Sequence, residues 1–118
     1  MQIYGIGTDI VSVPRIAASL SRHGNAFLEK IFTPFEIERL PKDAMLAQRV
    51  AARFSAKEAV VKAFGNHTQL YLQDIEILKH ESGAPYARVR GQHDATVMLS
   101  YSHTEEYATA TAIVFSGT

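Results

Sequence analysis

The stretch Arg53-Phe-Ser-Ala-Lys-Glu-Ala-Val-Val-Lys-Ala-Phe-Gly65 decides the fold that the sequence predicts. It closes a span from Asp43 to Phe64 that has no glycine or proline and many good helix formers, so we expect one helix of about six turns. Asp43 is a suitable N-cap residue, and Gly65 is a suitable C′ residue directly after the helix. One face of this helix carries Leu46, Val50, Phe54, Val60, Val61 and Phe64, and alanines fill many other positions. The pattern predicts a helix that is buried on nearly all sides.

Three charges interrupt this apolar pattern. Lys57 falls near the middle of the apolar face. Glu58 and Lys62 lie four residues apart, beside small alanines that let another group approach the backbone. Burying an unpaired charge costs several kcal/mol, so these side chains need counter-charges, which a ligand could supply.

Length and composition indicate one domain, which we place over residues 1–118. The chain has 118 residues and a mass of 13.0 kDa, with 47% hydrophobic and 20% charged residues, as in ordinary globular proteins. A chain of this size has room for a core but little for a deep cleft of its own, so oligomerisation would be a natural way to gain a site. No apolar run approaches the roughly 20 residues of a membrane span, and the first residues lack the basic region of a signal peptide. We therefore expect a cytoplasmic protein that does not bind membranes.

The charge distribution favours a small phosphorylated ligand. Cysteine is absent, which excludes disulfides, thiolate catalysis and cysteine-zinc sites. The net charge is zero, yet residues 39–62 hold six basic and two acidic side chains, and residues 91–118 hold three acids and neither lysine nor arginine. The rest of the chain offers no comparable basic field, so we expect no nucleic-acid track.

Other segments predict an α+β fold, with a mainly antiparallel sheet packed on one long central helix and shorter helices. We expect strands at Ile3–Val13, Leu70–Lys79, Tyr86–Arg90, Leu99–His103 and Tyr107–Phe115, with a brief helical segment near 93–98. Ser12 and Pro14 predict a helix that ends at Gly24, and Thr33-Pro34-Phe35-Glu36 has the pattern of a capping box. Gly5 and Gly7 lack the third glycine of a dinucleotide-binding fingerprint.

Asp9 and Glu58 are the acids least typical of a solvated surface, because each lies on a mostly apolar element. Two carboxylates with phosphate oxygens and water form a shell that suits Mg²⁺. The alternative is structural: Asp9 pairs with a lysine, and Glu58 pairs with Lys62 across one helical turn. Taken singly, each acid fits the structural interpretation better.

Together the motifs resemble the holo-[acyl-carrier-protein] synthases of the 4′-phosphopantetheinyl transferase superfamily. They follow the order of that family from Ile3 to about Val114. The matching segments are Gly5-Ile-Gly-Thr-Asp-Ile10, Phe32-Thr33 with Glu36, Arg53-Phe-Ser-Ala-Lys-Glu-Ala59, Lys62-Ala-Phe-Gly65, Gly83-Ala-Pro85, Ser102-His-Thr104 and Tyr107-Ala108. Departures include Asn66–Gln69, where relatives often carry a glycine-rich turn, and Ala84, where a lysine is frequent.

The resemblance implies the fold of that superfamily and transfer of 4′-phosphopantetheine from coenzyme A to a serine of acyl carrier protein in fatty acid biosynthesis. Adenosine 3′,5′-bisphosphate would be released. Members are typically homotrimers with coenzyme A between neighbouring subunits. Asp9 and Glu58 correspond to the Mg²⁺ ligands and Lys62 to the active-site lysine, and the proton acceptor stays open among these three.

The same resemblance implies further contacts for the two substrates. Coenzyme A would be bound by Arg53, Lys57, Lys62, Gly83, Pro85, His103 and Thr104, with His103 in a binding rather than a proton-transfer role. Arg15 and Arg22, which composition alone would leave as a solvated face, would dock the acidic carrier protein. Two alternatives remain: a Mg²⁺-dependent nucleotide hydrolase using the same acids, and a non-enzymatic oligomeric anion-binding module.

Overall fold

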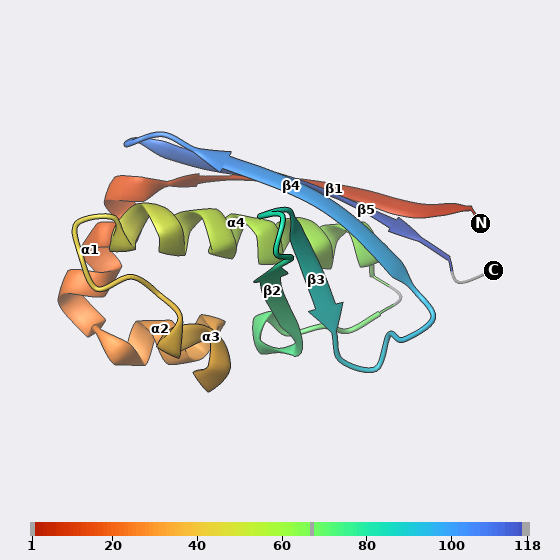
Figure 1. Cartoon of the computed structure of the whole chain (residues 1–118), viewed down its shortest axis with the longest axis horizontal. Coiled ribbons are helices and arrows are strands. Elements are labelled where there is room, and N and C mark those ends of the chain that lie inside the picture. The colour runs from red at the N-terminus through yellow and green to blue at the C-terminus, as the bar shows by residue number, and fades with distance from the viewer. Residues whose placement is uncertain (1, 67, 117–118) are drawn as a thin grey trace.

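The computed structural model describes residues 2–66 and 68–116 and has an α+β architecture, as predicted (Figure 1). In chain order the elements are β1 (Ile3–Ser12), α1 (Val13–His23), α2 (Asn25–Ile31), α3 (Pro34–Glu38), α4 (Leu46–Phe64), the 3-10 helix η1 (Leu72–Asp74), β2 (Ile75–Lys79), β3 (Pro85–Val89), β4 (Thr96–His103) and β5 (Tyr107–Phe115). None of the described helices is long and apolar enough to cross a membrane.

Two antiparallel sheets pack around the long helix α4. The larger sheet has the strand order β1-β5-β4, so β1 and β4 form its edges, and β2 pairs with β3 in a separate hairpin. Figure 1 shows α4 running along one face of the larger sheet, with α1 to α3 gathered at the end where α4 begins. Small inward side chains on β5 (Ala108, Ala110 and Ala112) let the helix approach the sheet closely.

The glycines of β1 bring that strand directly onto α4. A Cβ on Gly5 would lie 2.0 Å from the carbonyl oxygen of Ala63, and a Cβ on Gly7 would lie 2.0 Å from that of Ala59. Asp9 lies two residues after Gly7 on β1, and its carbonyl oxygen accepts a hydrogen bond from the Ser55 hydroxyl of α4 at 3.2 Å. These contacts fix the position of β1 along the helix.

The predicted burial of α4 is confirmed, but the helix is shorter than predicted. It begins at Leu46, because Asp43 Oδ1 accepts the N–H of Met45 in the preceding turn. Its last residue is Phe64, and the C-cap Gly65 that follows has a positive φ of 77°, which glycine adopts without strain. Ten of its residues are buried, including Val50, Val60 and Phe64.

Several other boundaries differ from the predictions. The segment before β2 forms η1 rather than strand, and the residues from Thr96 onward belong to β4 rather than to a helix. Helix α2 was not predicted as an element. The capping box of α3 is confirmed: Thr33 Oγ1 accepts the N–H of Glu36, and Glu36 Oε1 accepts the N–H of Thr33.

Candidate functional site

Asp9, Glu58 and Lys62 form a cluster on the β1 side of α4, which we call the carboxylate cluster. The Lys62 ammonium donates hydrogen bonds to Asp9 Oδ1 at 3.1 Å and to the carbonyl oxygen of Thr8 at 3.0 Å. Glu58 lies one turn earlier on α4, and its pKa is raised by burial and then by the nearby charge of Asp9. The structure therefore brings these three predicted residues together.

The carboxylate cluster has the donors that a hard cation requires. Asp9 Oδ2 is buried and has no hydrogen-bond partner among the described residues. Burial together with the charge of Asp9 raises the pKa of Glu58, so the two carboxylates repel each other in the absence of a cation. No group of three or more metal-ligating side chains occurs in the described part of the chain, so a cation here would complete its shell with water or ligand oxygens.

A hollow of about 370 Å³ opens on the β4 side of α4, and we call it the basic hollow. Its lining residues are Arg49, Ala52, Arg53, Lys79, Tyr101, Ser102 and His103. Two of its polar atoms, Arg49 Nε and Tyr101 Oη, are buried without a hydrogen-bond partner among the described residues. Three cationic side chains and two unused polar atoms suit an anionic, hydrogen-bonding ligand.

A neighbouring hollow extends this positive field. It shares Arg53 and Lys79 with the basic hollow and adds Arg39 and Arg88. The guanidinium of Arg39 stacks on the ring of Phe35 at 3.4 Å, which holds it at the rim. Arg53, predicted as a ligand contact, thus lies between two basic hollows.

The carboxylate cluster and the basic hollow lie on different flanks of α4. Glu58 and Arg53 are five residues apart, which places their side chains about 140° apart around the helix. Asp9 and His103 belong to opposite edge strands, with β5 between them, and their partners on β5 are two residues apart, so their backbones are about 12 Å apart at normal strand geometry. Within one chain the two groups therefore do not form one compact site.

The structure contradicts the prediction that Lys57 contacts the ligand. Its side chain is completely buried, and the ammonium donates to Glu36 Oε1 at 2.6 Å, to the carbonyl oxygen of Ile31 at 2.7 Å and to that of Leu72 at 3.1 Å. These three bonds use all of its N–H donors, so none is left for a phosphate. The counter-charge that the sequence required is Glu36, and the role of Lys57 is structural.

The remaining predicted contacts lie in turns or on exposed helix surface. Gly83, with a φ of 92°, belongs to the β2–β3 turn, and Pro85 is the first residue of β3. Thr104 Oγ1 accepts the N–H groups of Glu106 and Tyr107 and so shapes the β4–β5 turn. Arg15 and Arg22 are exposed and seven residues apart on α1, which places them on one face.

Sequence reasoning missed four polar residues at the basic hollow. Arg49, Lys79 and Tyr101 line it, and Gln48 lies beside it against His103. Arg49 carried a usable signal, because it belongs to the basic run between residues 39 and 62. Gln48 and Tyr101 had none, since their role depends on the meeting of α4 and β4.

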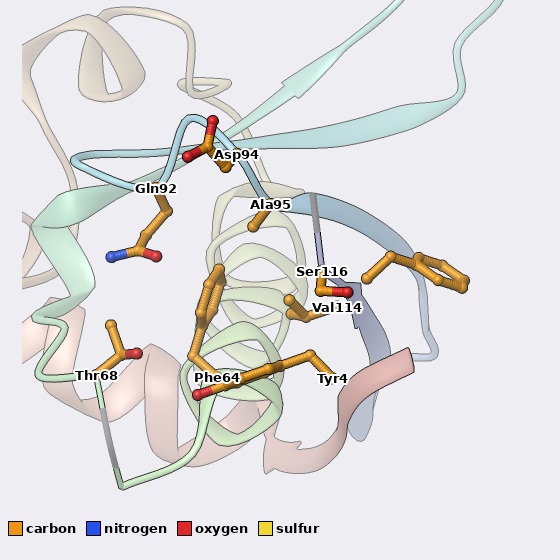
Figure 2. Close-up of a pocket in the computed structure, with 9 residues that line it drawn as sticks. Tyr4, Phe64, Thr68, Gln92, Asp94, Ala95, Val114 and Ser116 are labelled. Carbon is orange, nitrogen blue, oxygen red and sulfur yellow. The ribbon is translucent and has the colours of Figure 1, made fainter. Parts of the chain in front are cut away.

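A third pocket, of about 220 Å³, lies at the C-terminal end of α4 (Figure 2). Figure 2 shows Tyr4 and Phe64 on one side of it and Gln92, Asp94 and Ala95 on the other. No lysine or arginine lines it. Its chemistry therefore differs from that of the basic hollow and the carboxylate cluster.

Comparisons with known proteins agree on one family. The family model described as "4′-phosphopantetheinyl transferase superfamily" matches residues 5–112. A holo-[acyl-carrier-protein] synthase from a Wolbachia of Drosophila simulans is 42% identical over 115 residues, covering 95% of this chain and 98% of the relative. The Bacillus subtilis protein of the same name is 40% identical over 116 residues, covering 95% of each chain.

Solved structures lead to the same result. The holo-[acyl-carrier-protein] synthase of Neisseria meningitidis superposes with a TM-score of 0.86 at 33% identity, covering 97% of this chain and 99% of that one. The Bacillus anthracis synthase in complex with CoA (3′,5′-ADP) also has a TM-score of 0.86, at 34% identity, covering 98% and 99%.

Proposed function

The chain belongs to the 4′-phosphopantetheinyl transferase superfamily and is an enzyme of the holo-[acyl-carrier-protein] synthase type, and we propose the reaction that follows from this. It transfers the 4′-phosphopantetheine group of coenzyme A to a serine of apo acyl carrier protein and releases adenosine 3′,5′-bisphosphate. The P–O bond to the leaving bisphosphate breaks as the serine oxygen bonds to the same phosphorus. The modified carrier would serve fatty acid biosynthesis.

The observation that carries this proposal is the position of the Lys62 ammonium against Asp9. An ammonium has three N–H donors, and Lys62 uses two of them on Asp9 Oδ1 and the carbonyl oxygen of Thr8. Its third N–H has no partner among the described residues and can bind a phosphate oxygen. Held in this way, Lys62 stabilises negative charge that grows on the diphosphate as the bond breaks.

The donor set of the carboxylate cluster fits Mg²⁺, and Asp9 and Glu58 would hold it. When bound, the ion would neutralise charge on the diphosphate oxygens as a Lewis acid. The unused Oδ2 of Asp9 supports this assignment, because an unpaired buried carboxylate oxygen is costly without a cation or donor.

Glu58 is the proposed acceptor of the serine proton. Burial together with Asp9 raises the pKa of Glu58 when no cation is bound, and a bound Mg²⁺ would oppose that shift, so the position of Glu58 beside Asp9 and Lys62 is what supports this role. In this role Glu58 takes the hydroxyl proton directly or through one water.

Coenzyme A is proposed to lie between two copies of the chain. The carboxylate cluster of one copy would face the diphosphate, and the basic hollow of a neighbour, with Arg53 and His103, would hold the nucleotide end; Gly83, Pro85 and Thr104 would form the rim. The placement of the two groups on different flanks of α4 supports this arrangement. It is compatible with a homotrimer.

The outer face of the larger sheet supports association between copies. By strand alternation, its outward side chains include Ile6, Ile10 and Met98, which are 63%, 67% and 59% exposed. The other outward residues on the three strands, by alternation and pairing, are Ile3, Thr8, Ser12, Thr96, Ser100, Ser102, Tyr107, Thr109, Thr111, Ile113 and Phe115, so these strands place no charge on the face. An uncharged, partly apolar sheet face is typical of a surface that another chain covers.

Arg15 and Arg22 on α1 are the proposed docking site for the acidic carrier protein. Both side chains project from one exposed helix face, and neither forms a salt bridge among the described residues. Such charges accelerate association with an acidic partner without contributing to the chemistry.

The test is incubation with coenzyme A, apo carrier protein and Mg²⁺, followed by intact mass of the carrier. Gain of the phosphopantetheine mass supports the transferase. Bisphosphate release without carrier modification would indicate the hydrolase, and no reaction would leave the anion-binding module. Glu58→Ala should abolish turnover with an unchanged circular dichroism spectrum, whereas the control Glu81→Ala, on the exposed β2–β3 turn, should not. Full activity of the parent in EDTA would exclude the metal assignment.

A further inference from the structure

Helix α4 holds β1 around Asp9 by three hydrogen bonds. Lys62 donates to Oδ1 of Asp9 and to the carbonyl oxygen of Thr8. The third bond comes from two turns earlier on the helix, where the Ser55 hydroxyl donates to the carbonyl oxygen of Asp9 at 3.2 Å. The side chain of Asp9 is only 13% exposed, so little of its position is left to solvent.

Ser55 is an unusual residue for its place in the helix. Among the ten buried residues that the structure describes in α4, only Ser55 and Lys57 carry a polar side chain. A serine inside a helix usually faces solvent or bonds the carbonyl oxygen of the preceding turn, and alanine is the better helix former. The hydroxyl of Ser55 instead reaches across to β1, and this is its only side-chain hydrogen bond among the described residues. Helix propensity therefore does not explain the serine, whereas the contact with Asp9 does.

The same contact connects the two carboxylates of the carboxylate cluster. Asp9 Oδ1 accepts from Lys62, whereas Oδ2 is buried without a partner in the described part of the chain. Glu58 lies three residues after Ser55 on α4, on the same side of the helix. Ser55 thus fixes the backbone of Asp9 to the helical turn that carries Glu58.

We propose that Ser55 is a positioning residue for the cation: its hydroxyl anchors the backbone of Asp9 to α4 and so sets the separation of the Asp9 and Glu58 carboxylates. Ser55 touches neither the cation nor coenzyme A. Mg²⁺ demands near-ideal ligand geometry, so a small displacement of Asp9 weakens its binding. The inference rests on the proposed function, because it takes Asp9 and Glu58 as the cation's ligands.

Ser55→Ala removes the hydroxyl and keeps a good helix former. Mn²⁺ is the probe, because it accepts the oxygen ligands that Mg²⁺ does, and electron paramagnetic resonance of the free ion measures its binding without turnover. The Kd for Mn²⁺ should rise about three- to tenfold, the effect of losing one neutral hydrogen bond behind a ligand. The Mg²⁺ concentration that gives half-maximal carrier modification should rise by the same factor, while kcat at saturating Mg²⁺ stays within about twofold.

A control separates positioning from a general loss of stability. Val50→Ala is suitable, because Val50 is completely buried in α4 and packs in the cluster that includes Val13, Leu28 and Ile31. It should lower the urea midpoint at least as much as Ser55→Ala does and leave the Kd for Mn²⁺ within about 1.5-fold. The carbonyl carbon-13 resonance of Asp9 should shift only in Ser55→Ala, since only that variant removes its hydrogen-bond donor.

Three results would overturn the proposal: a parent-like Mn²⁺ affinity in Ser55→Ala, an equal loss of affinity in Val50→Ala, or a fall in kcat that saturating Mg²⁺ does not restore. A parent protein that binds no Mn²⁺ would overturn it together with the metal assignment. If the parent binds Mn²⁺ but does not modify the carrier, the proposed function fails instead, and the Mn²⁺ affinities of the two variants still decide the role of Ser55.

Discussion

Gly7 lies directly against the carbonyl oxygen of Ala59: a Cβ at this position would stand 2.0 Å from that oxygen and 2.9 Å from the Cβ of Lys62. The glycine is needed for contact rather than for turn formation. By letting β1 rest on α4, it sets Asp9 opposite Glu58 and Lys62.

Gly7→Ala should therefore damage both stability and activity. The added methyl group would clash with the backbone of α4, which cannot move aside as a flexible side chain can. We therefore expect a loss of about 1–3 kcal/mol or more in the free energy of unfolding. Displacing β1 also moves Asp9, and carrier modification should fall at least tenfold. Urea unfolding and the intact-mass assay measure the two effects. Thr8→Ala, on the outer face of the same strand, should change neither by a comparable amount, and parent-like behaviour of Gly7→Ala would contradict the contact.

The sheet face gives a prediction about assembly. Ile10 is 67% exposed on the uncharged outer face of β1. Ile10→Lys would place a charge in the proposed contact between copies, so the oligomer should dissociate and activity should fall with it. Analytical ultracentrifugation measures the mass. Ala26→Lys, at an exposed position on α2, provides the control and should leave the mass unchanged. A parent protein that sediments as a monomer and is fully active would refute the shared site.

Arg15 and Arg22 predict a salt-sensitive encounter with the carrier. Arg15→Glu with Arg22→Glu should raise the KM for the carrier at least tenfold at low salt while changing the KM for coenzyme A little. The difference between variant and parent should shrink as salt is added, because the charges are exposed. Steady-state kinetics at two salt concentrations measure this. Arg90→Glu is the exposed-arginine control, and equal effects on both substrates would remove α1 as the docking helix.

Glu76 links the β2–β3 hairpin to α3 and predicts a pH effect. Arg88 donates to Glu76 Oε1 at 2.6 Å and Thr33 to Oε2 at 2.8 Å, and the hydrogen bond from Arg88 is the main cause of its lowered pKa. A lowered folded-state pKa gives stability that is present above the unfolded value of 4.5 and is lost as pH falls through the folded value. Glu76→Gln should therefore flatten the decline in urea midpoint below about pH 5, whereas Glu81→Gln should retain the parent slope.

The sequence predicted the local features and missed those that depend on distant contacts. The glycine- and proline-free span predicted α4, and Thr33 with Glu36 predicted the cap of α3, because propensity and capping act within a few residues. The hydrogen bond between His103 and Gln48 joins residues 55 apart in the sequence, and no local spacing rule predicts it. Asp9 and Glu58 were singled out because each lies on a mostly apolar element, but each acid alone fitted a structural ion pair, and only the family resemblance assigned both to one Mg²⁺ site.

Lys57 and Glu36 form another contact between distant residues that the sequence did not predict, and the pair can be tested by mutation. They form a buried pair, with side chains 0% and 2% exposed, in which Glu36 Oε2 also accepts the N–H of Ile77 on β2. Lys57→Met would leave the Glu36 charge buried and unpaired, which costs about 3–5 kcal/mol. Adding Glu36→Gln removes that charge, so the double variant should recover a large part of the loss, and urea unfolding of both variants measures it. If Lys57 instead bound ligand, Lys57→Met would weaken coenzyme A binding while leaving stability unchanged.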